Sequence, residues 1–436
     1  MRDPERHVAQ IVDHLFRRES GRLVAILSRR LGARHLHLAQ DVVQDALLRA
    51  MEAWPFSGVP ANPSAWLLQT ARNRALDALR RNGVWGQNSA ALAPLIEDCA
   101  QQALAAPPPQ FEEEIADAQL RMMFVCCHPE LPADTQVALI LKTLCGFGER
   151  EIAAAFLVSE AAVGKKLVRA RKLLRETGLS LELPAAAELA PRLESVLRAL
   201  YLLFNEGYKA SHGDTLLRAD LCSEAIRLAE LLAASPLGGR PETHALLALL
   251  HLHAARLGSR LADDGALLLL AAQDRARWDR GQIARGIAHL EKSAAGERVT
   301  RWHLEAGIAA CHALAPTYQA TDWPRILSLY DKIEALAPSP VVALNRASAV
   351  AHVHGNGAGL QALEKIPDRR ALAHYYLYHA VTGQIQLAAG RALEAAESLG
   401  RALALAQQPA EKCLLAQRLA AAQARILADS PRVSSG

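Results

Sequence analysis

The sequence has no long apolar run, and its cysteines form no recognisable framework. No stretch approaches the roughly 18 apolar residues that a membrane helix requires. The first residues, MRDPERHVAQIVDHL, lack the apolar core of a signal peptide. The seven cysteines are odd in number and scattered, which argues against a set of disulfides. We therefore expect a cytoplasmic protein with no membrane partner.

Aromatic residues are also scarce, at 5% of the chain, while Ala and Leu are abundant. Ala and Leu lose little conformational freedom in a helix, and no segment shows the alternation typical of a β-strand. With 51% hydrophobic and 22% charged residues over 436 positions, the composition is that of a globular protein with several domains. The expected fold class is all-α.

Positive charge is missing from one stretch near the middle of the N-terminal half. Residues 82–120 contain several acids but no Lys or Arg. Residues 1–81 carry thirteen Lys and Arg against eight Asp and Glu, and residues 142–175 carry eight against three. Two basic modules joined by an acidic connector indicate two contacts with a polyanion. Ordinary solvated surface charge is the alternative.

The first basic module has the periodicity of amphipathic helices, with apolar residues three and four positions apart. The segment from Pro55 to Pro63 is rich in Pro and Gly and is expected to break the helix before it. A further helix is predicted from Ser64 to about Arg81. Residues 82–111 then contain three consecutive prolines and few large apolar side chains, and are expected to be flexible or extended.

The second basic module contains the pattern of a helix-turn-helix in residues 148–175. Two short helices are predicted to meet at Leu157 and Val158, with Ser159 as the N-cap of the second helix. Ile152, Ala153 and Phe156 are expected to pack inward from the first.

The second helix of this motif separates into two opposed faces at 100° per residue. The apolar face consists of Val163, Leu167, Ala170 and Leu174. The opposite face consists of Lys165, Arg169 and Lys172, extended by Ala161 and flanked by Lys166, Arg171 and Arg175. An apolar back and a basic front are what a recognition helix needs in the major groove of DNA. An ordinary basic surface helix is the alternative.

Residues 131–147 and the helix-turn-helix after them resemble region 4 of bacterial RNA polymerase sigma factors of the extracytoplasmic-function type, in the sigma-70 family. Residues 38–54 and 62–81 independently resemble two successive segments of sigma region 2. In that family, region 4 binds the −35 promoter element and the flap of the polymerase β subunit. Region 2 binds the coiled coil of the β′ subunit and opens the −10 element. The resemblance therefore implies core RNA polymerase and promoter DNA as partners.

The resemblance also assigns roles to particular residues. The polar contacts with core polymerase would be made by Asp41, Gln44, Asp45 and Arg49. The −10 element would be bound by Arg72, Asn73, Arg74, Asp77, Arg80 and Arg81. The −35 element would be bound by Ser159, Ala161, Lys165, Lys166, Arg169 and Lys172. Within the −10 set, Asn73 stands where the family places a group that reads a base pulled out of the duplex.

The remainder of the chain is rich in Ala and Leu and is predicted to be helical throughout. Near its end, five positions have the spacing of a tetratricopeptide (TPR) unit: Gly383, Gly390, Ala395, Leu399 and Ala402. Residues 199–208 and 273–279 are among the segments that resemble the C-terminal extension of a sigma subgroup with TPR-like repeats. That resemblance implies a regulatory extension with a possible protein or peptide partner. An irregular helical bundle is the alternative.

These observations predict four parts of the chain. They are region 2 in residues 1–83, an acidic and Pro-rich linker in residues 84–123, region 4 in residues 124–178, and a TPR-like helical extension in residues 179–436.

Other functions have weaker support in the sequence. Cys126, Cys127 and His128 are adjacent, but structural zinc sites use four ligands in paired spacing, and no second pair matches. We expect no metal, no cofactor and no catalytic residue, since no nucleophile–base or phosphate-loop pattern is present. The alternative function is a helix-turn-helix regulator with a TPR-like sensor domain, which would not need the segment that resembles region 2.

Overall fold

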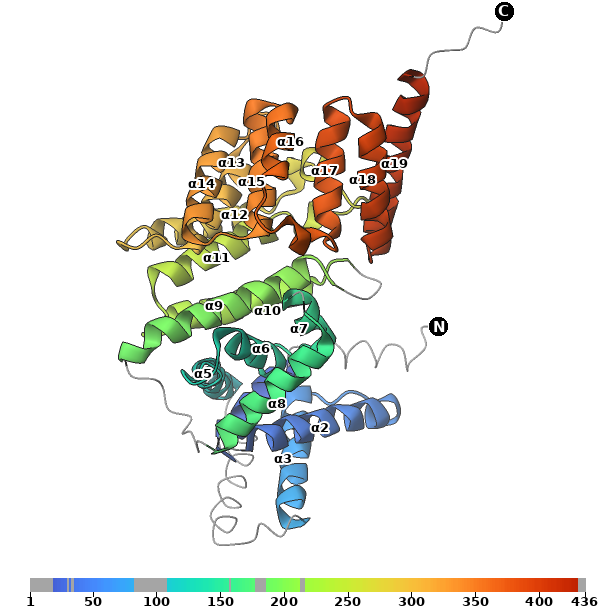
Figure 1. Ribbon diagram of the computed structural model, residues 1–436. Coiled ribbons are helices and arrows are strands. Elements are labelled where there is room, and N and C mark those ends of the chain that lie inside the picture. Colours follow the sequence, from blue (N-terminus) through green and yellow to red (C-terminus); the bar gives the residue numbers. More distant parts are fainter. Residues whose placement is uncertain are drawn as a thin grey trace, which may run out of the picture. The chain divides into compact units, whose positions relative to one another are not determined.

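The computed structural model describes residues 19–29, 31–32, 35–81, 108–156, 158–176, 186–211 and 216–429. The described chain is built from helices (Figure 1), with no strand within these ranges, so the all-α expectation is confirmed. The chain forms two compact units. The first comprises Met1–Glu206 and Asp220–Gly238, and the second comprises Gly207–Ala219 and Gly239–Gly436. No described helix combines the length and hydropathy needed to cross a bilayer.

The named helices of the first unit range in length from 8 residues in α7 to 23 residues in α9. After a helical segment at residues 19–29 come α2 (Leu36–Ser57), α3 (Pro63–Arg81), α5 (Pro108–Val125), α6 (Ala133–Thr143), α7 (Glu149–Phe156), α8 (Glu160–Glu176), α9 (Ala186–Tyr208) and α10 (Ala219–Ala234).

Helices α2 and α3 differ slightly from the predicted boundaries. Helix α2 continues through Pro55 to Ser57, and Gly58, with a φ of 79°, ends it. Pro55 removes only one hydrogen bond from the last turn, so the helix persists for two more residues. Helix α3 begins at Pro63, one residue before the predicted start. Its N-cap is Asn62, whose Oδ1 accepts a hydrogen bond from the Ala65 N–H at 3.0 Å.

The expectation that residues 82–111 are flexible or extended is wrong for residues 108–111, and the predicted linker is helical over residues 108–123. They belong to α5, whose first residue is a proline, a position where the missing N–H costs nothing. Ala118, Leu120 and Met122 are buried, so packing stabilises the helix. The rest of the predicted linker, residues 84–107, lies outside the described residues.

The two basic modules touch each other within the first unit. A Cβ atom on Gly21 would overlap the backbone of Leu144, just after α6. The Gln40 side chain of α2 donates a hydrogen bond to the Thr143 hydroxyl at 3.2 Å. The absence of a side chain at Gly21 therefore permits the close approach of the two modules.

Helices α9 and α10 pack on α5. The Arg192 guanidinium donates to the Phe124 carbonyl at 3.3 Å, and Arg227 donates to the Gln119 side chain at 2.9 Å. These contacts place most of α9 and α10 in the first unit. The predicted boundary at residue 179 therefore does not coincide with the division between the two units.

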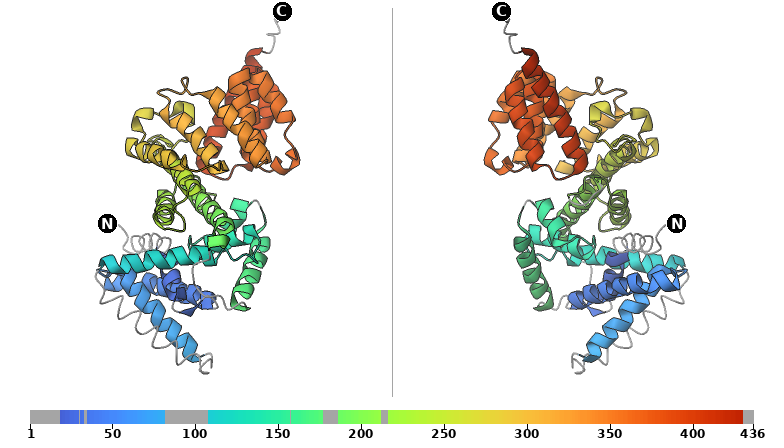
Figure 2. Two further views of the ribbon diagram at one scale, coloured as in Figure 1. Left: turned by 90° about the vertical axis from the view of Figure 1, so that its left-hand side faces the viewer. Right: turned by 90° about the vertical axis from the view of Figure 1, so that its right-hand side faces the viewer.

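The second unit is a succession of helices that each pack on their neighbours in the chain. They are α11 (Pro241–Ala254), α12 (Arg280–Ser293), α13 (Arg301–Leu314), α14 (Trp323–Leu336), α15 (Pro340–His354), α16 (Asn356–Glu364), α17 (Tyr376–Ala388), α18 (Ala392–Leu405) and α19 (Pro409–Asp429). Figure 2 shows the last of them, in orange to red, side by side in both views. Packing between successive helices is what stacked helical pairs produce, and the TPR-like repeat stays a prediction.

Small residues lie where α17 and α18 pack. Ala395, Leu399 and Ala402 are fully buried in one cluster with α19. A Cβ on Gly383 would lie 2.8 Å from Leu399 Cγ and 3.2 Å from the Ala395 carbonyl oxygen. Gly400, on the same pair of helices, has nothing within 4 Å of that position.

Substitution of these two glycines by alanine should have opposite effects on stability. Gly400→Ala should raise the free energy of unfolding by about 0.5–1 kcal/mol, because glycine disfavours a helix interior. Gly383→Ala should instead lower the free energy of unfolding by about 1–3 kcal/mol, because the added methyl group overpacks the interface with Leu399. Denaturant unfolding followed by circular dichroism measures both. Equal effects of the two substitutions would contradict this packing.

Candidate nucleic-acid interface

Helices α7 and α8 form the predicted helix-turn-helix. The Ser159 Oγ accepts a hydrogen bond from the Ala162 N–H at 3.3 Å, and its carbonyl accepts one from Val163, so the predicted N-cap is confirmed. Leu157, at the predicted turn, lies outside the described residues. Ile152 and Ala153 are buried as predicted, whereas Phe156 is only half-buried.

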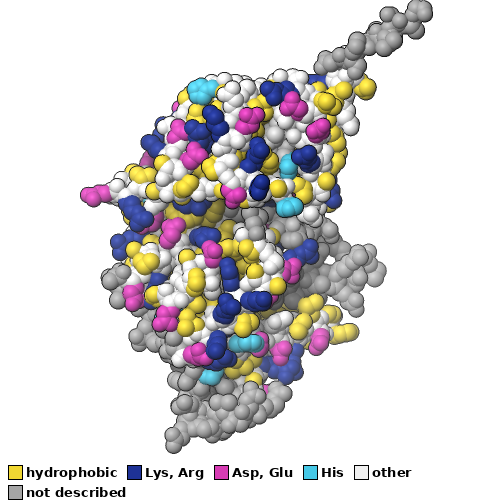
Figure 3. Space-filling view, viewed as in Figure 1, with side chains coloured by type: hydrophobic (Ala, Val, Ile, Leu, Met, Phe, Trp, Pro, Cys, Tyr) yellow, Lys and Arg dark blue, Asp and Glu magenta, His cyan; other side chains and the backbone are white. Residues whose placement is uncertain are grey.

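Helix α8 has the two faces that its sequence predicts. The buried residues are Val163, Leu167, Ala170 and Leu174. The exposed residues include Ser159 at the cap, Ala161, Lys165, Arg169 and Lys172. Figure 3 shows Lys and Arg side chains gathered where Figure 1 draws α8. Lys165 and Arg169 form no ion pair with any described residue, so both cations remain available to phosphates and base edges.

Lys166 lies in a different environment from the other α8 cations. It is half-buried, its Nζ lies 3.9 Å from Asp134 Oδ2, and it lies 5.9 Å from the centre of the Phe156 ring. Arg198 of α9 binds the same carboxylate at 2.7 Å and stacks on the same ring at 5.3 Å. Lys166 is therefore on the flank of α8 that faces α6 and α9, away from the open cationic face.

The predicted polymerase-contact residues share one exposed side of α2. They are Asp41, Gln44, Asp45 and Arg49, all exposed. Val42, Val43, Ala46 and Ala50 are buried on the other side. Asp41 pairs with His37 at 2.6 Å, and Asp45 lies 3.9 Å from Arg74 of α3.

Two apolar residues on the same side of α2 were not predicted as contacts. Leu48 is 52% exposed and Met51 is 46% exposed. Leu48 and Met51 follow Gln44 by four and seven residues, which places them on this face. An exposed apolar pair among acidic and amide side chains is typical of a protein-binding surface.

The structure describes the side chains of four of the six predicted −10 residues, all of them on α3. Arg72 donates to Gln69 at 3.4 Å, and Gln69 donates to the exposed Asn73 at 3.3 Å. Arg74 is half-buried beside Asp45, and Asp77 is exposed. Arg80 and Arg81 lie in the last turn of α3, but their side chains lie outside the described residues.

Burial of the cysteines explains why the Cys126–Cys127–His128 sequence gathers no ligand set. Cys126 and Cys127 are fully buried. Desolvation raises the pKa of Cys126 to about 12 and raises that of Cys127 as well, which disfavours the thiolate that a metal binds. Among the described residues, no cluster of three or more potential ligands forms.

Comparison with protein families identifies both modules. Residues 15–84 match sigma-70 region 2, and residues 121–174 match sigma-70 region 4. The two regions, in this order in one chain, and the similarity to sigma factors described below support a sigma-70-like RNA polymerase sigma factor. In this sigma factor, residues 192–294 also match a family of unknown function (DUF6596), which begins within α9 and ends just after α12.

One relative of this sigma factor is similar over most of the chain, and others are similar over less than half of it. The uncharacterized protein R00370 of Rhizobium meliloti is 39% identical over 397 residues, covering 88% of this chain and 90% of that protein. The probable RNA polymerase sigma factor RfaY of Xanthomonas campestris is 30% identical over 145 residues, covering 33% of this chain and 34% of its own. The ECF sigma factor SigG of Mycobacterium tuberculosis is 28% identical over 187 residues, covering 40% and 50%.

Arg169→Ala tests the open face of α8. Arg169 has no ion pair among the described residues, so its removal should leave the thermal unfolding temperature unchanged. Affinity of the sigma factor for a −35 duplex should fall by about 1–3 kcal/mol if the side chain donates to a base edge. The matched control is Arg285→Ala, which removes an exposed arginine from α12. Unchanged DNA affinity, measured by fluorescence anisotropy at fixed salt, would remove Arg169 from the interface.

Proposed function

We propose that this sigma factor binds core RNA polymerase and directs it to promoters through separate surfaces on region 2 and region 4. The observation that supports this most strongly is the match to both regions in a chain whose α2 exposes all of the expected polar residues and whose α3 and α8 expose some of theirs. A helix-turn-helix regulator that acts without polymerase does not account for region 2. The proposed activity needs no catalysis and no cofactor, and it takes place where polymerase is, in the cytoplasm.

In this proposal, region 4 reads the −35 element with the open face of α8. Lys165, Arg169 and Lys172 supply cations to the major groove, and Ser159 and Ala161 lie at the end of the helix nearest the bases. Lys166, held toward Asp134 at 3.9 Å, serves the phosphate backbone at the margin of the site. The same region would contact the β flap of polymerase.

Region 2 binds the β′ coiled coil through α2 and opens the −10 element with α3. The α2 surface combines the predicted polar contacts with the apolar Leu48 and Met51, a combination suited to a protein partner. Asn73 is exposed on α3 and carries both a donor and an acceptor, which suits it to the edge of an unpaired base. Arg72, Arg74, Arg80 and Arg81 would hold phosphates, with Asp77 beside them.

The second unit is proposed to regulate these activities. It follows α9 and α10, which are part of the first unit through Arg192, Arg198 and Arg227. Truncation at residue 178 would therefore remove contacts on which region 4 itself depends. A chain that ends at Gly238 keeps those contacts and removes most of the second unit.

Asp45→Arg should abolish co-purification with core RNA polymerase. The change reverses the charge at the centre of the exposed α2 face, and like charges at an interface weaken binding strongly. Asp263→Arg, a reversal at an exposed position of the second unit, is the control and should not affect co-purification. Circular dichroism establishes that both variants fold. If the Asp45 variant still co-purifies and initiates transcription, α2 is not the polymerase contact.

The chain that ends at Gly238 tests the regulatory role. Its transcription from a cognate promoter with purified core polymerase should be lost or should no longer respond to the conditions that control the full-length protein. Far-ultraviolet circular dichroism and DNA binding by region 4 serve as controls for folding. The regulatory role is wrong if the shortened and full-length proteins have equal activity both in vitro and in cells.

A further inference from the structure

The second unit contains a mostly apolar cavity of about 550 Å³. It lies among α15, α17, α19 and the loop of residues 267–271, and its wall includes Leu267, Leu269, Val381 and Leu414. Small-molecule sites in proteins usually measure about 300–1,000 Å³ and are mainly apolar with a few polar groups. The cavity has the size and lining of such a site, and is too small for a folded partner.

One charged side chain in this wall has no partner among the residues that the structure describes. Arg418 of α19 forms no hydrogen bond or ion pair with any described residue, although it is partly buried. Desolvation by burial lowers the pKa of its guanidinium, which nonetheless stays charged at neutral pH. A charge removed from water is costly unless an opposite charge accompanies it. An anion in the cavity would supply that charge.

The other ionisable groups of the wall are already satisfied or neutral. The Glu411 carboxylate is bound by Lys209 at 3.1 Å and accepts a hydrogen bond from the Tyr376 hydroxyl. His352 stacks on Trp323 at 3.7 Å, and burial lowers its pKa, so it is uncharged at neutral pH. Lys209 and Glu411 cancel, which leaves the single positive charge of Arg418.

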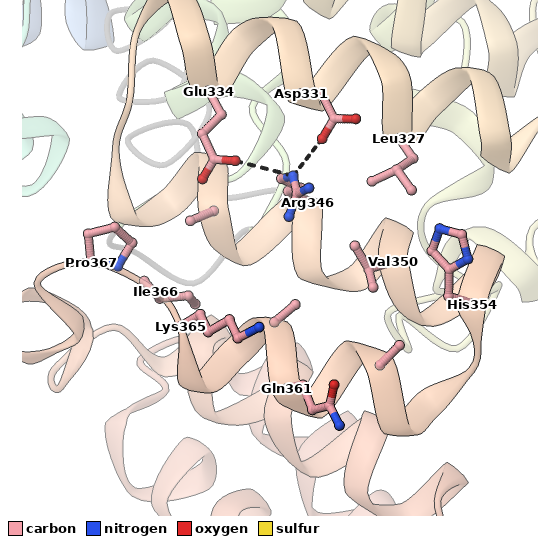
Figure 4. Close-up of a pocket in the computed structure, with 13 residues that line it drawn as sticks. Leu327, Asp331, Glu334, Arg346, Val350, His354, Gln361, Lys365, Ile366 and Pro367 are labelled. Carbon is pink, nitrogen blue, oxygen red and sulfur yellow. Dashed lines mark hydrogen bonds and ion pairs between the residues drawn. The ribbon is translucent and has the colours of Figure 1, made fainter.

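A second cavity in the same unit provides a contrast (Figure 4). It measures about 450 Å³ and lies among α14, α15 and α16. Its arginine, Arg346, is bound by Asp331 at 2.7 Å and by Glu334 at 3.2 Å. The guanidinium there is neutralised by the protein itself, whereas that of Arg418 is not.

We propose that the cavity beside Arg418 binds a small organic acid with one carboxylate and an apolar body. The carboxylate would accept paired hydrogen bonds from the guanidinium, a geometry that suits the two groups. The apolar body would lie against Val381, Leu414 and the loop at Leu267. A phosphate dianion fits less well, because the wall offers one unbalanced positive charge. Ser348, Asn356 and Gln384 supply neutral hydrogen-bonding groups for further substituents.

The test measures binding of simple probes to the full-length protein by isothermal titration calorimetry and thermal unfolding. The probes are octanoate and 4-phenylbutyrate, with 1-octanol and octylamine as the neutral and cationic counterparts of octanoate. The carboxylates should bind at least about tenfold more tightly than the alcohol and the amine, since a hydrogen bond to a charged group adds affinity of that order. They should also raise the unfolding temperature, because they bind the folded state.

Arg418→Gln should reduce carboxylate affinity by about tenfold or more and leave octanol binding unchanged. Arg418→Lys should restore part of the loss, since it keeps the charge but loses the paired geometry. Arg346→Gln makes the same change in the neighbouring cavity and should leave carboxylate affinity as it is in the unmodified protein.

Three outcomes would overturn the proposal. They are no binding of either carboxylate to the unmodified protein, equal binding of octanoate and octylamine, and undiminished carboxylate binding by a folded Arg418→Gln variant. Neither polymerase nor DNA is present in these measurements. Their result is therefore independent of whether the roles proposed for regions 2 and 4 are correct.

Discussion

Two arginines of α9, Arg192 and Arg198, join the first part of the extension to region 4. Arg192 bonds to the last turn of α5, and Arg198 bonds to the first turn of α6. Arg192 is only 9% exposed, and its guanidinium donates to the Phe124 carbonyl in the last turn of α5, which also accepts a hydrogen bond from the Cys127 N–H. Arg198 binds Asp134 in the first turn of α6, where a carboxylate also offsets the positive end of the helix. Since Asp134 also lies 3.9 Å from Lys166 of α8, helices α8 and α9 are linked through one carboxylate.

Local features of this sigma factor could be predicted from the sequence because local contacts determine them. The buried face of α8 follows from the 3.6-residue period, and Ser159 caps it through its own neighbours. Helix boundaries were less predictable where Pro was taken as a break. Pro55 lies inside the last turn of α2, and a proline begins α5, where the sequence had predicted an extended linker. In both places, tertiary packing or helix position outweighs the usual effect of proline.

Long-range features could not be predicted, because no sequence period connects their members. Arg198 and Asp134 are 64 residues apart, and the wall of the Arg418 cavity comes from segments between residues 267 and 418. The same holds for the contacts that join the beginning and end of the second unit. Lys209 binds Glu411, and Gln408 donates to the Ala210 carbonyl at 2.9 Å. A row of helices that contact only their neighbours tends to unfold piecemeal, and these contacts oppose that by joining its two ends.

The bare backbone at Gly21 has a consequence for the energetics of holoenzyme assembly. It lets region 2 and region 4 touch, with Gln40 bonded to Thr143 across the junction. If a partner binds only when the two regions are apart, then only the fraction of molecules with separated regions can bind it. The apparent dissociation constant is the intrinsic value divided by that fraction. A tenfold decrease in the separated fraction therefore weakens apparent binding tenfold. For a partner of that kind, the junction at Gly21 raises the concentration at which half of the protein is bound.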